Sequence, residues 1–205
     1  MMKKPAKKKP AKKDQIKEMS NKELCLVRNQ GGWDAELARE TLISRDPRLA
    51  KKLTDATIDE AMISYFEKEH TYGDIECWDV SNVTDMENMF YYYQEFNPDI
   101  SGWDVSNVTN MKGMFSECDE FNADLSKWNV SNVTDMEGMF SSCYEFNADL
   151  SKWNVSKVTN MDYMFNGCHE FNADLFKWNV SNVTDMEGMF SSCYEFNADL
   201  SKWNV

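Results

Sequence analysis

Four cysteines have the clearest capacity for chemistry, and they recur every 25 residues: Cys118, Cys143, Cys168 and Cys193. A zinc site needs pairs of ligands two to four residues apart that converge on one point, whereas this spacing places the thiols in a line. We expect buried free thiols, with disulfides between neighbours or a metal site as alternatives. Cys25 and Cys77 lie off this ladder, and in a reducing compartment we expect them to be free as well.

Asparagines follow the same period, and an aspartate follows each of them two residues later. We expect the amides to bond backbone groups of the adjoining repeat, because buried backbone groups must find partners. Calcium is the alternative, but the loop spacings of calcium-binding repeats and EF-hands are absent. The asparagines are Asn97, Asn122, Asn147, Asn172 and Asn197, and the aspartates are Asp99, Asp124, Asp149, Asp174 and Asp199.

Residues for catalysis are scattered. The two histidines, His70 and His169, are far apart, and no phosphate-binding loop or nucleophile elbow is present. An active site is a single asymmetric constellation, whereas these side chains recur in rows. We therefore predict a protein that is not an enzyme and needs no cofactor or metal. The competing hypothesis is an enzyme whose chemistry lies in residues 14–72.

Rows of polar side chains are the candidate binding site. They suit extended recognition of a protein partner, or of other subunits of an assembly; the alternative is a merely solvated face. The rows comprise Asp79, Asp104, Asn129, Asn154 and Asn179, together with Lys127, Lys152, Lys177 and Lys202.

The spacing of the tryptophans indicates the repeated structural units that must position these rows. Trp78, Trp103, Trp128, Trp153, Trp178 and Trp203 are each 25 residues apart, and residues 131–155 and 181–205 are identical. A fixed period of this length indicates stacked supersecondary units. In the third repeat, the alternation of Trp128 and Val130 predicts a short strand from about Lys127 to Ser131. Apolar residues at helical spacing predict a helical turn that begins after Thr134. The fold class is thus an α/β repeat solenoid, with five repeats and the start of a sixth in residues 78–205.

The N-terminal part differs in composition. Residues 1–13 are rich in Lys, Pro and Ala and carry a charge of +7, which predicts a disordered arm. Residues 14–77 predict a helical segment whose last helix caps the first repeat. Capping boxes are expected at Ser20–Glu23 and Thr57–Glu60, and Asp46-Pro47 is expected to start a helix that runs through Leu53. Another helix is expected from Asp34 to Ile43.

Charge and hydropathy restrict the partners. Residues 78–205 carry a net charge of −15 and the whole chain −13. An acidic body does not suit a nucleic-acid-binding domain, although the arm could contact phosphate weakly. No apolar run is long enough to span a bilayer, and no secretory signal is present. We expect an intracellular location, or one within a virus particle assembled in a host cell. The chain stops at Val205 without a polar cap, which predicts a fragment of a longer array or an end that docks on a partner.

The repeat frame L-x-x-W-x-V-S-x-V-T-x-M-x-x-M-F-x-x-C-x-x-F-N-x-D resembles the BspA-like repeats, a variant of the leucine-rich repeats. The resemblance covers residues from about 58 to 205. It implies a right-handed solenoid used for recognition, without catalytic residues. Such repeats also occur in large DNA viruses, so a structural component of a virion or scaffold is one context that the resemblance suggests.

Overall fold

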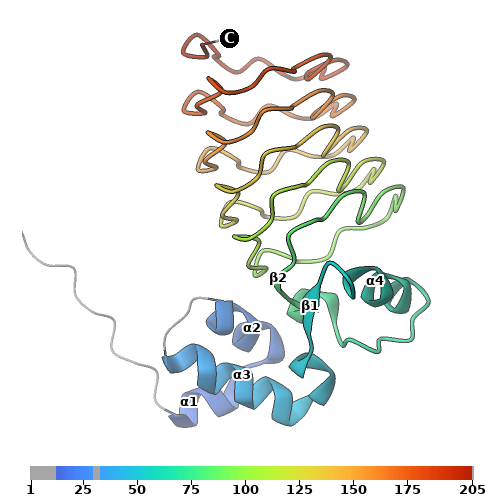
Figure 1. Ribbon diagram of the computed structural model, residues 1–205, viewed down its shortest axis with the longest axis vertical. Helices are drawn as coiled ribbons and strands as arrows, with labels where there is room; N and C mark the ends of the chain where they lie inside the picture. The colour runs from blue at the N-terminus through green and yellow to red at the C-terminus, as the bar shows by residue number, and fades with distance from the viewer. Residues whose placement is uncertain (1–12, 30–32, 205) are drawn as a thin grey trace, which may run out of the picture.

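The computed structural model describes residues 13–29 and 33–204, which form a helical N-terminal part and a long stack of repeats (Figure 1). Apart from Lys13, the predicted arm lies outside the described residues. The elements are α1 (Lys13–Glu18), α2 (Asn21–Asn29), α3 (Trp33–Arg45), the 3-10 helix η1 (Pro47–Ala50), β1 (Lys52–Thr54), α4 (Ile58–Phe66), the 3-10 helix η2 (Ile75–Cys77) and β2 (Asp79–Asn82).

Helix α2 begins at the predicted capping box. The backbone N–H of Ser20 donates to Oε2 of Glu23 at 2.7 Å, and the N–H of Glu23 donates to Oγ of Ser20 at 3.3 Å. This exchange satisfies two amides that a helix N-terminus leaves without partners. Helix α3 covers the predicted range and continues to Arg45, whose guanidinium donates to the carbonyl of Lys17 at 2.7 Å and so joins α3 to α1.

The predicted helix from Asp46 to Leu53 is wrong beyond its first turn. The side chain of Asp46 does accept the N–H of Arg48 at 3.1 Å, but η1 ends at Ala50. The chain then enters β1, which pairs in parallel with β2, with Lys52 opposite Asp79. Tertiary pairing overrides the helical tendency here, because β1 gives the first repeat a neighbouring strand.

The predicted capping box at Thr57 and Glu60 is also wrong, although the helix after it is present. Oγ of Thr57 accepts the backbone N–H of Thr54 at 3.0 Å and closes the turn between β1 and α4. Helix α4 therefore begins without a side-chain cap. Its apolar face contributes Ile58 and Met62 to the core of the repeats.

The repeats are mostly irregular. From Val83 to Asn204 the described chain contains no helix or extended strand, only turns and isolated parallel bridges. The strand and the helical turn predicted in the third repeat are therefore wrong as secondary structure. The bridges join equivalent residues of successive repeats: Asp85, Asn110, Asp135, Asn160 and Asp185.

Hydrogen bonds between repeats explain why no helix forms after Thr134. In a helix each N–H would bond to the carbonyl four residues earlier. Gly138 has a φ of +58°, which interrupts a right-handed helix and which glycine adopts readily. Alternate backbone N–H groups donate instead to carbonyls one repeat further on, at 2.7–3.0 Å: Met136 to Asn160, Gly138 to Asp162 and Phe140 to Met164.

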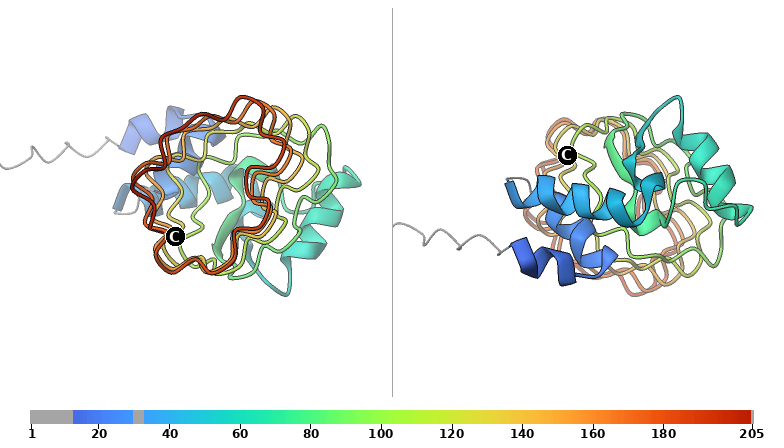
Figure 2. Two further views of the ribbon diagram at one scale, coloured as in Figure 1. Left: turned by 90° about the horizontal axis from the view of Figure 1, so that it is seen from above. Right: turned by 90° about the horizontal axis from the view of Figure 1, so that it is seen from below.

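One hydrophobic core runs from β1 and α4 through the repeats. The rings of Trp103 and Trp128 stack with centroids 6.5 Å apart, and those of Phe115 and Phe140 lie 5.6 Å apart. The indole N–H of Trp128 donates to the carbonyl of Ile100 in the previous repeat at 3.1 Å, so the buried ring leaves no unpaired donor. Seen along the stack, the outlines of the repeats lie over one another (Figure 2). Aromatic clusters thus recur with the 25-residue period of the sequence.

A second, smaller core holds α1–α3 and η1 together, with Leu24, Leu42 and Leu49 buried in it. Cys25 and Cys77 form a disulfide there, with Cα atoms 5.4 Å apart. The expectation that all six cysteines are free is therefore wrong for this pair. The two residues are 52 apart in the sequence, and they meet because η2 passes beside α2 where the chain enters the repeats.

Candidate binding face

The candidate site follows from which side chains the repeat buries. In the third repeat Leu125, Trp128 and Val130 are buried, which leaves Lys127 and Asn129 exposed. Equivalent residues align from repeat to repeat because the repeats stack in register. We call the surface formed by the following residues the Lys–Asn face: Lys127, Lys152, Lys177, Lys202, Asn129, Asn154, Asn179 and Asn204.

Each asparagine in the middle of this face also supports the backbone. Oδ1 of Asn129 accepts the N–H of Ser131 at 3.2 Å, and Asn154 and Asn179 make the same contact. In the first two repeats the acceptors are Asp79 and Asp104. The side-chain NH₂ groups of the three asparagines have no hydrogen-bond partner among the described residues, so they can donate to a ligand.

The lysines of the face are exposed and unpaired. Among the described lysines of the repeats, only Lys112 forms an ion pair, with Glu137 at 2.8 Å. The carboxylate before Lys127 in the sequence is Asp124, which accepts the N–H of Ser126 at 2.9 Å. Hydrogen bonds from Ser126 lower the pKa of Asp124, and the charge of Lys127 lowers it further. The lysines thus lie beside ionised carboxylates that are already hydrogen-bonded elsewhere.

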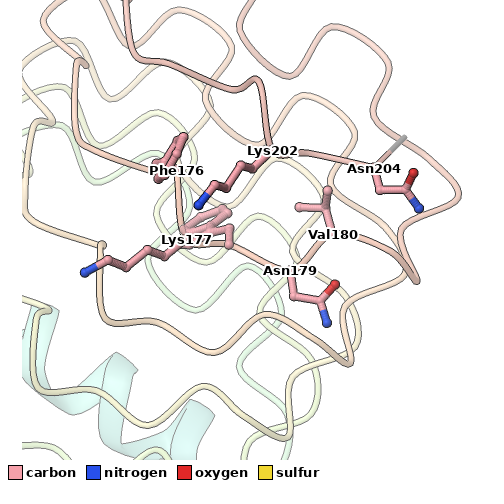
Figure 3. Close-up of a pocket in the computed structure, with 7 residues that line it drawn as sticks. Phe176, Lys177, Asn179, Val180, Lys202 and Asn204 are labelled. Carbon is pink, nitrogen blue, oxygen red and sulfur yellow. The ribbon is translucent and has the colours of Figure 1, made fainter.

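Two cavities mark this side of the molecule. One of about 350 Å³ lies between the fifth repeat and the start of the sixth, where Phe176 replaces the usual serine (Figure 3). Nζ of Lys202 lies 4.4 Å from the centre of the Phe176 ring, whereas Lys177 extends away from it. The other, of about 480 Å³, is lined by Leu26 of α2, by Trp103 and by Lys127. Helix α2 therefore borders one end of the face.

Sequence reasoning missed Lys157, an exposed lysine in the same repeat as Lys152. It occupies the position of Asn132 one repeat later, and its Nζ donates to Oδ1 of Asn132 at 2.7 Å. At three other occurrences, Asn107, Asn132 and Asn182, the asparagine donates to a serine carbonyl of the previous repeat, as Asn132 does to Ser106 at 2.7 Å. The sequence did contain a signal for Lys157, because a lysine stands there at a position where the other repeats have asparagine.

The cysteine ladder is structural. Each Sγ donates to the carbonyl of a phenylalanine in the previous repeat, as Cys143 does to Phe115 at 3.0 Å. Burial raises the pKa of Cys118 to about 12 and that of Cys193 to about 11, and it raises the pKa of Cys143 and Cys168 well above the ordinary value. These groups stay thiols at neutral pH, whereas nucleophiles and metal ligands are thiolates.

The asparagine ladder bonds to the backbone. Oδ1 of Asn122 accepts the N–H of Asn147 at 3.0 Å, and the same contact links each member to the next. The neighbouring aspartates are also occupied, as Asp149 accepts the N–H of Ser151 at 2.9 Å. Within residues 13–29 and 33–204, no group of three or more His, Cys, Asp or Glu is placed to hold a metal ion.

The two histidines lie in different places. His70 packs edge-on against Tyr65 where the repeats begin. His169 is half-buried, and its ring stacks between those of Tyr144 and Tyr194, with centroids 4.7 Å away on each side. The structure does not bring them together with a nucleophile or with each other.

A depression of about 730 Å³ at the start of the repeats was not predicted. Tyr65, Phe66, Tyr92 and Tyr93 line it, and the rings of Phe66 and Tyr93 stack face to face with centroids 3.4 Å apart. The signal in the sequence is the run from Tyr91 to Tyr93, where the third repeat has Ser141, Ser142 and Cys143.

Comparison with known proteins gives a family and no function. A family model described as "Mycoplasma protein of unknown function, DUF285" matches residues 60–166 and again residues 128–205. No curated protein and no solved structure matched. Among the described residues, no helix has the length and apolar character of a membrane span. The matched segments cover most of the chain, which therefore belongs to the DUF285 family, a repeat family related to the BspA-like surface repeats.

Proposed function

We propose that this protein is a non-enzymatic protein–protein interaction or assembly module. In this proposal the repeats form a right-handed, leucine-rich-repeat-like solenoid, which presents the Lys–Asn face to a protein partner. The observation that carries the proposal is the face itself, a set of exposed and unpaired lysines and asparagine amides repeated in register.

The solenoid is supported by contacts that link each repeat to its neighbours. Parallel bridges join Asp85 to Asn110 and continue as far as Asp185. Phenylalanine rings at equivalent positions stack along the same direction, as Phe140 does on Phe165 with centroids 5.7 Å apart. Repeat architectures are defined by structural units that each contact only the neighbouring units.

A binding role is favoured over a solvated surface by a difference between exposed columns. Lysine and asparagine are kept at their two positions in all repeats from Lys127 onward. Another column of the same repeats changes its residue type, from Tyr144 to His169 and back to Tyr194. A surface that only needs to be soluble has no reason to hold one column constant while its neighbour varies, because most surface substitutions cost little stability.

The context of this binding stays a prediction. The location inside a cell or a virus particle and the virion or scaffold role rest on the sequence alone. A disulfide such as Cys25–Cys77 is typical of oxidising compartments, which argues against the cytosol. The weak nucleic-acid contact through residues 1–13 likewise stays a prediction.

Site-directed photo-crosslinking tests the proposal. A photoreactive group attached at Asn154→Cys on the face should capture one stoichiometric protein partner from cells that make this protein. The matched control carries the same group at Glu170→Cys, an exposed position in the same repeat outside the face. Equal capture from both positions, or no capture from Asn154→Cys, would contradict the proposal.

A further inference from the structure

We propose that the Lys–Asn face binds an extended acidic segment of a partner protein, with carboxylates on alternate residues facing the lysine column. This inference rests on the proposed function and deepens it by naming the chemistry of the partner. It depends on the distribution of charge, the orientation of hydrogen-bonding groups and the spacing of the repeats.

Charge is segregated within the repeats. Residues 78–205 contain twenty-one acidic residues and six lysines. Five of those lysines lie in residues 125–134, 150–159, 175–184 and 200–204, and these segments contain no Asp or Glu. The lysines of the face are thus separated in sequence from most acidic residues, and the carboxylates that border them, Asp124, Asp149 and Asp199, already accept backbone N–H groups. The ammonium groups of the face attract anionic groups and repel cationic ones at short range, where salt screens least.

Hydrogen-bonding groups on the face are mostly donors. The Oδ1 atoms of Asn129, Asn154 and Asn179 each accept a serine N–H, which leaves their NH₂ groups available. Lysine ammonium groups are donors only, and serine hydroxyls can serve in either role. A ligand that supplies acceptors, as carboxylates and backbone carbonyls do, satisfies these groups.

Spacing favours an extended segment over a helix. Each lysine of the face immediately precedes a tryptophan in the sequence, and the stacked tryptophan rings lie 6.3–6.5 Å apart from one repeat to the next. We take this distance as the spacing of the lysine column. Alternate residues of an extended strand are about 6.6–6.8 Å apart, whereas successive turns of a helix are about 5.4 Å apart. Across the four lysines the mismatch is about 1 Å for a strand and about 3 Å for a helix. Flexible lysine side chains accommodate the smaller difference.

The observations favour a protein partner over a single-stranded nucleic acid. Binding of single strands relies on aromatic platforms for the bases. Phe176 lies beside the face, and Nζ of Lys202 already occupies its ring at 4.4 Å from the centre. The body of the protein is also strongly acidic, with a net charge of −13 for the whole chain.

Fluorescence anisotropy with defined probes tests the inference. The probe is a labelled peptide of alternating Glu and Thr that is long enough to span four repeats, and its matched control is an isomer with all Glu residues in one block. The full chain is compared with Lys127→Glu/Lys152→Glu/Lys177→Glu and with Lys3→Glu/Lys4→Glu/Lys7→Glu, which makes the same change of net charge in the arm. Circular dichroism checks that both variants are folded.

We expect the alternating peptide to bind more tightly than its isomer, and binding to weaken as salt is raised. The face variant should lose at least about tenfold in affinity because three attractive pairs become repulsive, and the arm variant should change less than about twofold. The inference is overturned if the arm variant loses as much as the face variant, if both peptides bind equally, or if oligothymidine binds more tightly than the peptide. An absence of peptide binding would overturn it while leaving the crosslinking test of the proposed function intact.

Discussion

The repeats and the N-terminal helices are stabilised in different ways. In the repeats the same three hydrogen bonds recur. A tryptophan N–H and a cysteine thiol each donate to a backbone carbonyl of the previous repeat, and an asparagine oxygen accepts a backbone N–H of the next repeat. The N-terminal helices are attached by contacts that occur once. These are the disulfide between Cys25 and Cys77, the bonds from Arg28 to two carbonyls and the ion pair of Lys22 with Asp99 at 2.7 Å.

Asp55 shows how one region meets the other. Within the repeats, the N–H and Oγ of Thr109 donate to the carbonyl of Thr84 at 2.8 and 3.2 Å. Thr84 belongs to the first repeat, and its N–H and Oγ donate to the carboxylate of Asp55 at 2.7 and 2.6 Å. A single side chain thus supplies the acceptors that a preceding repeat would supply. The repeats are therefore stabilised by many equivalent contacts, whereas the junction between the N-terminal part and the repeats depends on a few contacts that each occur once.

The largest effect is expected inside the core of the repeats. Trp153→Ala removes a buried ring that stacks on Trp178, and it leaves the carbonyl of Leu125 without its donor. We expect a loss of about 3–5 kcal/mol in the free energy of unfolding, measured by urea denaturation. Lys152→Ala, at the exposed neighbouring position, is the control and should change stability by less than about 0.5 kcal/mol. A loss at Trp153 as small as that of the control would contradict the stacked core.

Breaking the disulfide should separate the two regions. Cys25→Ser/Cys77→Ser opens a loop of 52 residues, and the chain-entropy relation gives a loss of roughly 4 kcal/mol for a loop of that size. Because the small core of α1–α3 depends on this link, its amides should exchange hydrogen faster while those of the repeats stay protected. Hydrogen-exchange mass spectrometry distinguishes the regions. A uniform rise in exchange over the whole chain would refute this division.

Removing the carboxylate at the junction should have a smaller effect. Asp55→Ala removes the acceptor for the exposed N–H groups of Thr84 and Asp85. Water can replace it in part, so we expect a loss of about 1 kcal/mol in the free energy of unfolding. Asp59→Ala, an exposed position in the first turn of α4, serves as the control. If both variants unfold at the same urea concentration, Asp55 does not cap the repeats.

Acidification should remove the contribution of the Asp55 carboxylate to the free energy of unfolding. Partial burial acts to raise the pKa of Asp55, but hydrogen bonds from Thr84 and Asp85 outweigh it, so the folded-state pKa lies below the ordinary value of 3.8. A lowered carboxyl pKa stabilises the fold above the unfolded-state value, and the contribution is lost as pH falls through the folded-state value. The difference in unfolding free energy between the wild type and Asp55→Asn should therefore begin to shrink below about pH 4 and continue to shrink as pH falls through the lower folded-state pKa. A difference that persists unchanged at lower pH would show that the charge of Asp55 is not the cause.

Much of the stack could be predicted because the sequence repeats its buried positions without interruption. The local conformation could not, since apolar residues such as Met136, Met139 and Phe140 have the same spacing in a helix and in a series of tight turns. Gly138 was the available clue, because glycine favours the positive φ found there. The Cys25–Cys77 link and the role of Asp55 depend on contacts between distant segments, which no local pattern reveals. For the candidate face, the rows were visible in the sequence, but the inward orientation of each asparagine oxygen required the structure.

Engineered disulfides between repeats test the central claim most directly. Asn110 and Asp135 are partners in a parallel bridge, and strand neighbours about 4.8 Å apart fall within the Cα range that a disulfide allows. Under mild oxidation Asn110→Cys/Asp135→Cys should form a bond, seen by mass spectrometry of proteolytic peptides, whereas Asp85→Cys/Asp135→Cys, two repeats apart, should not. The stacked arrangement is contradicted if the two pairs oxidise equally, or if only the distant pair does.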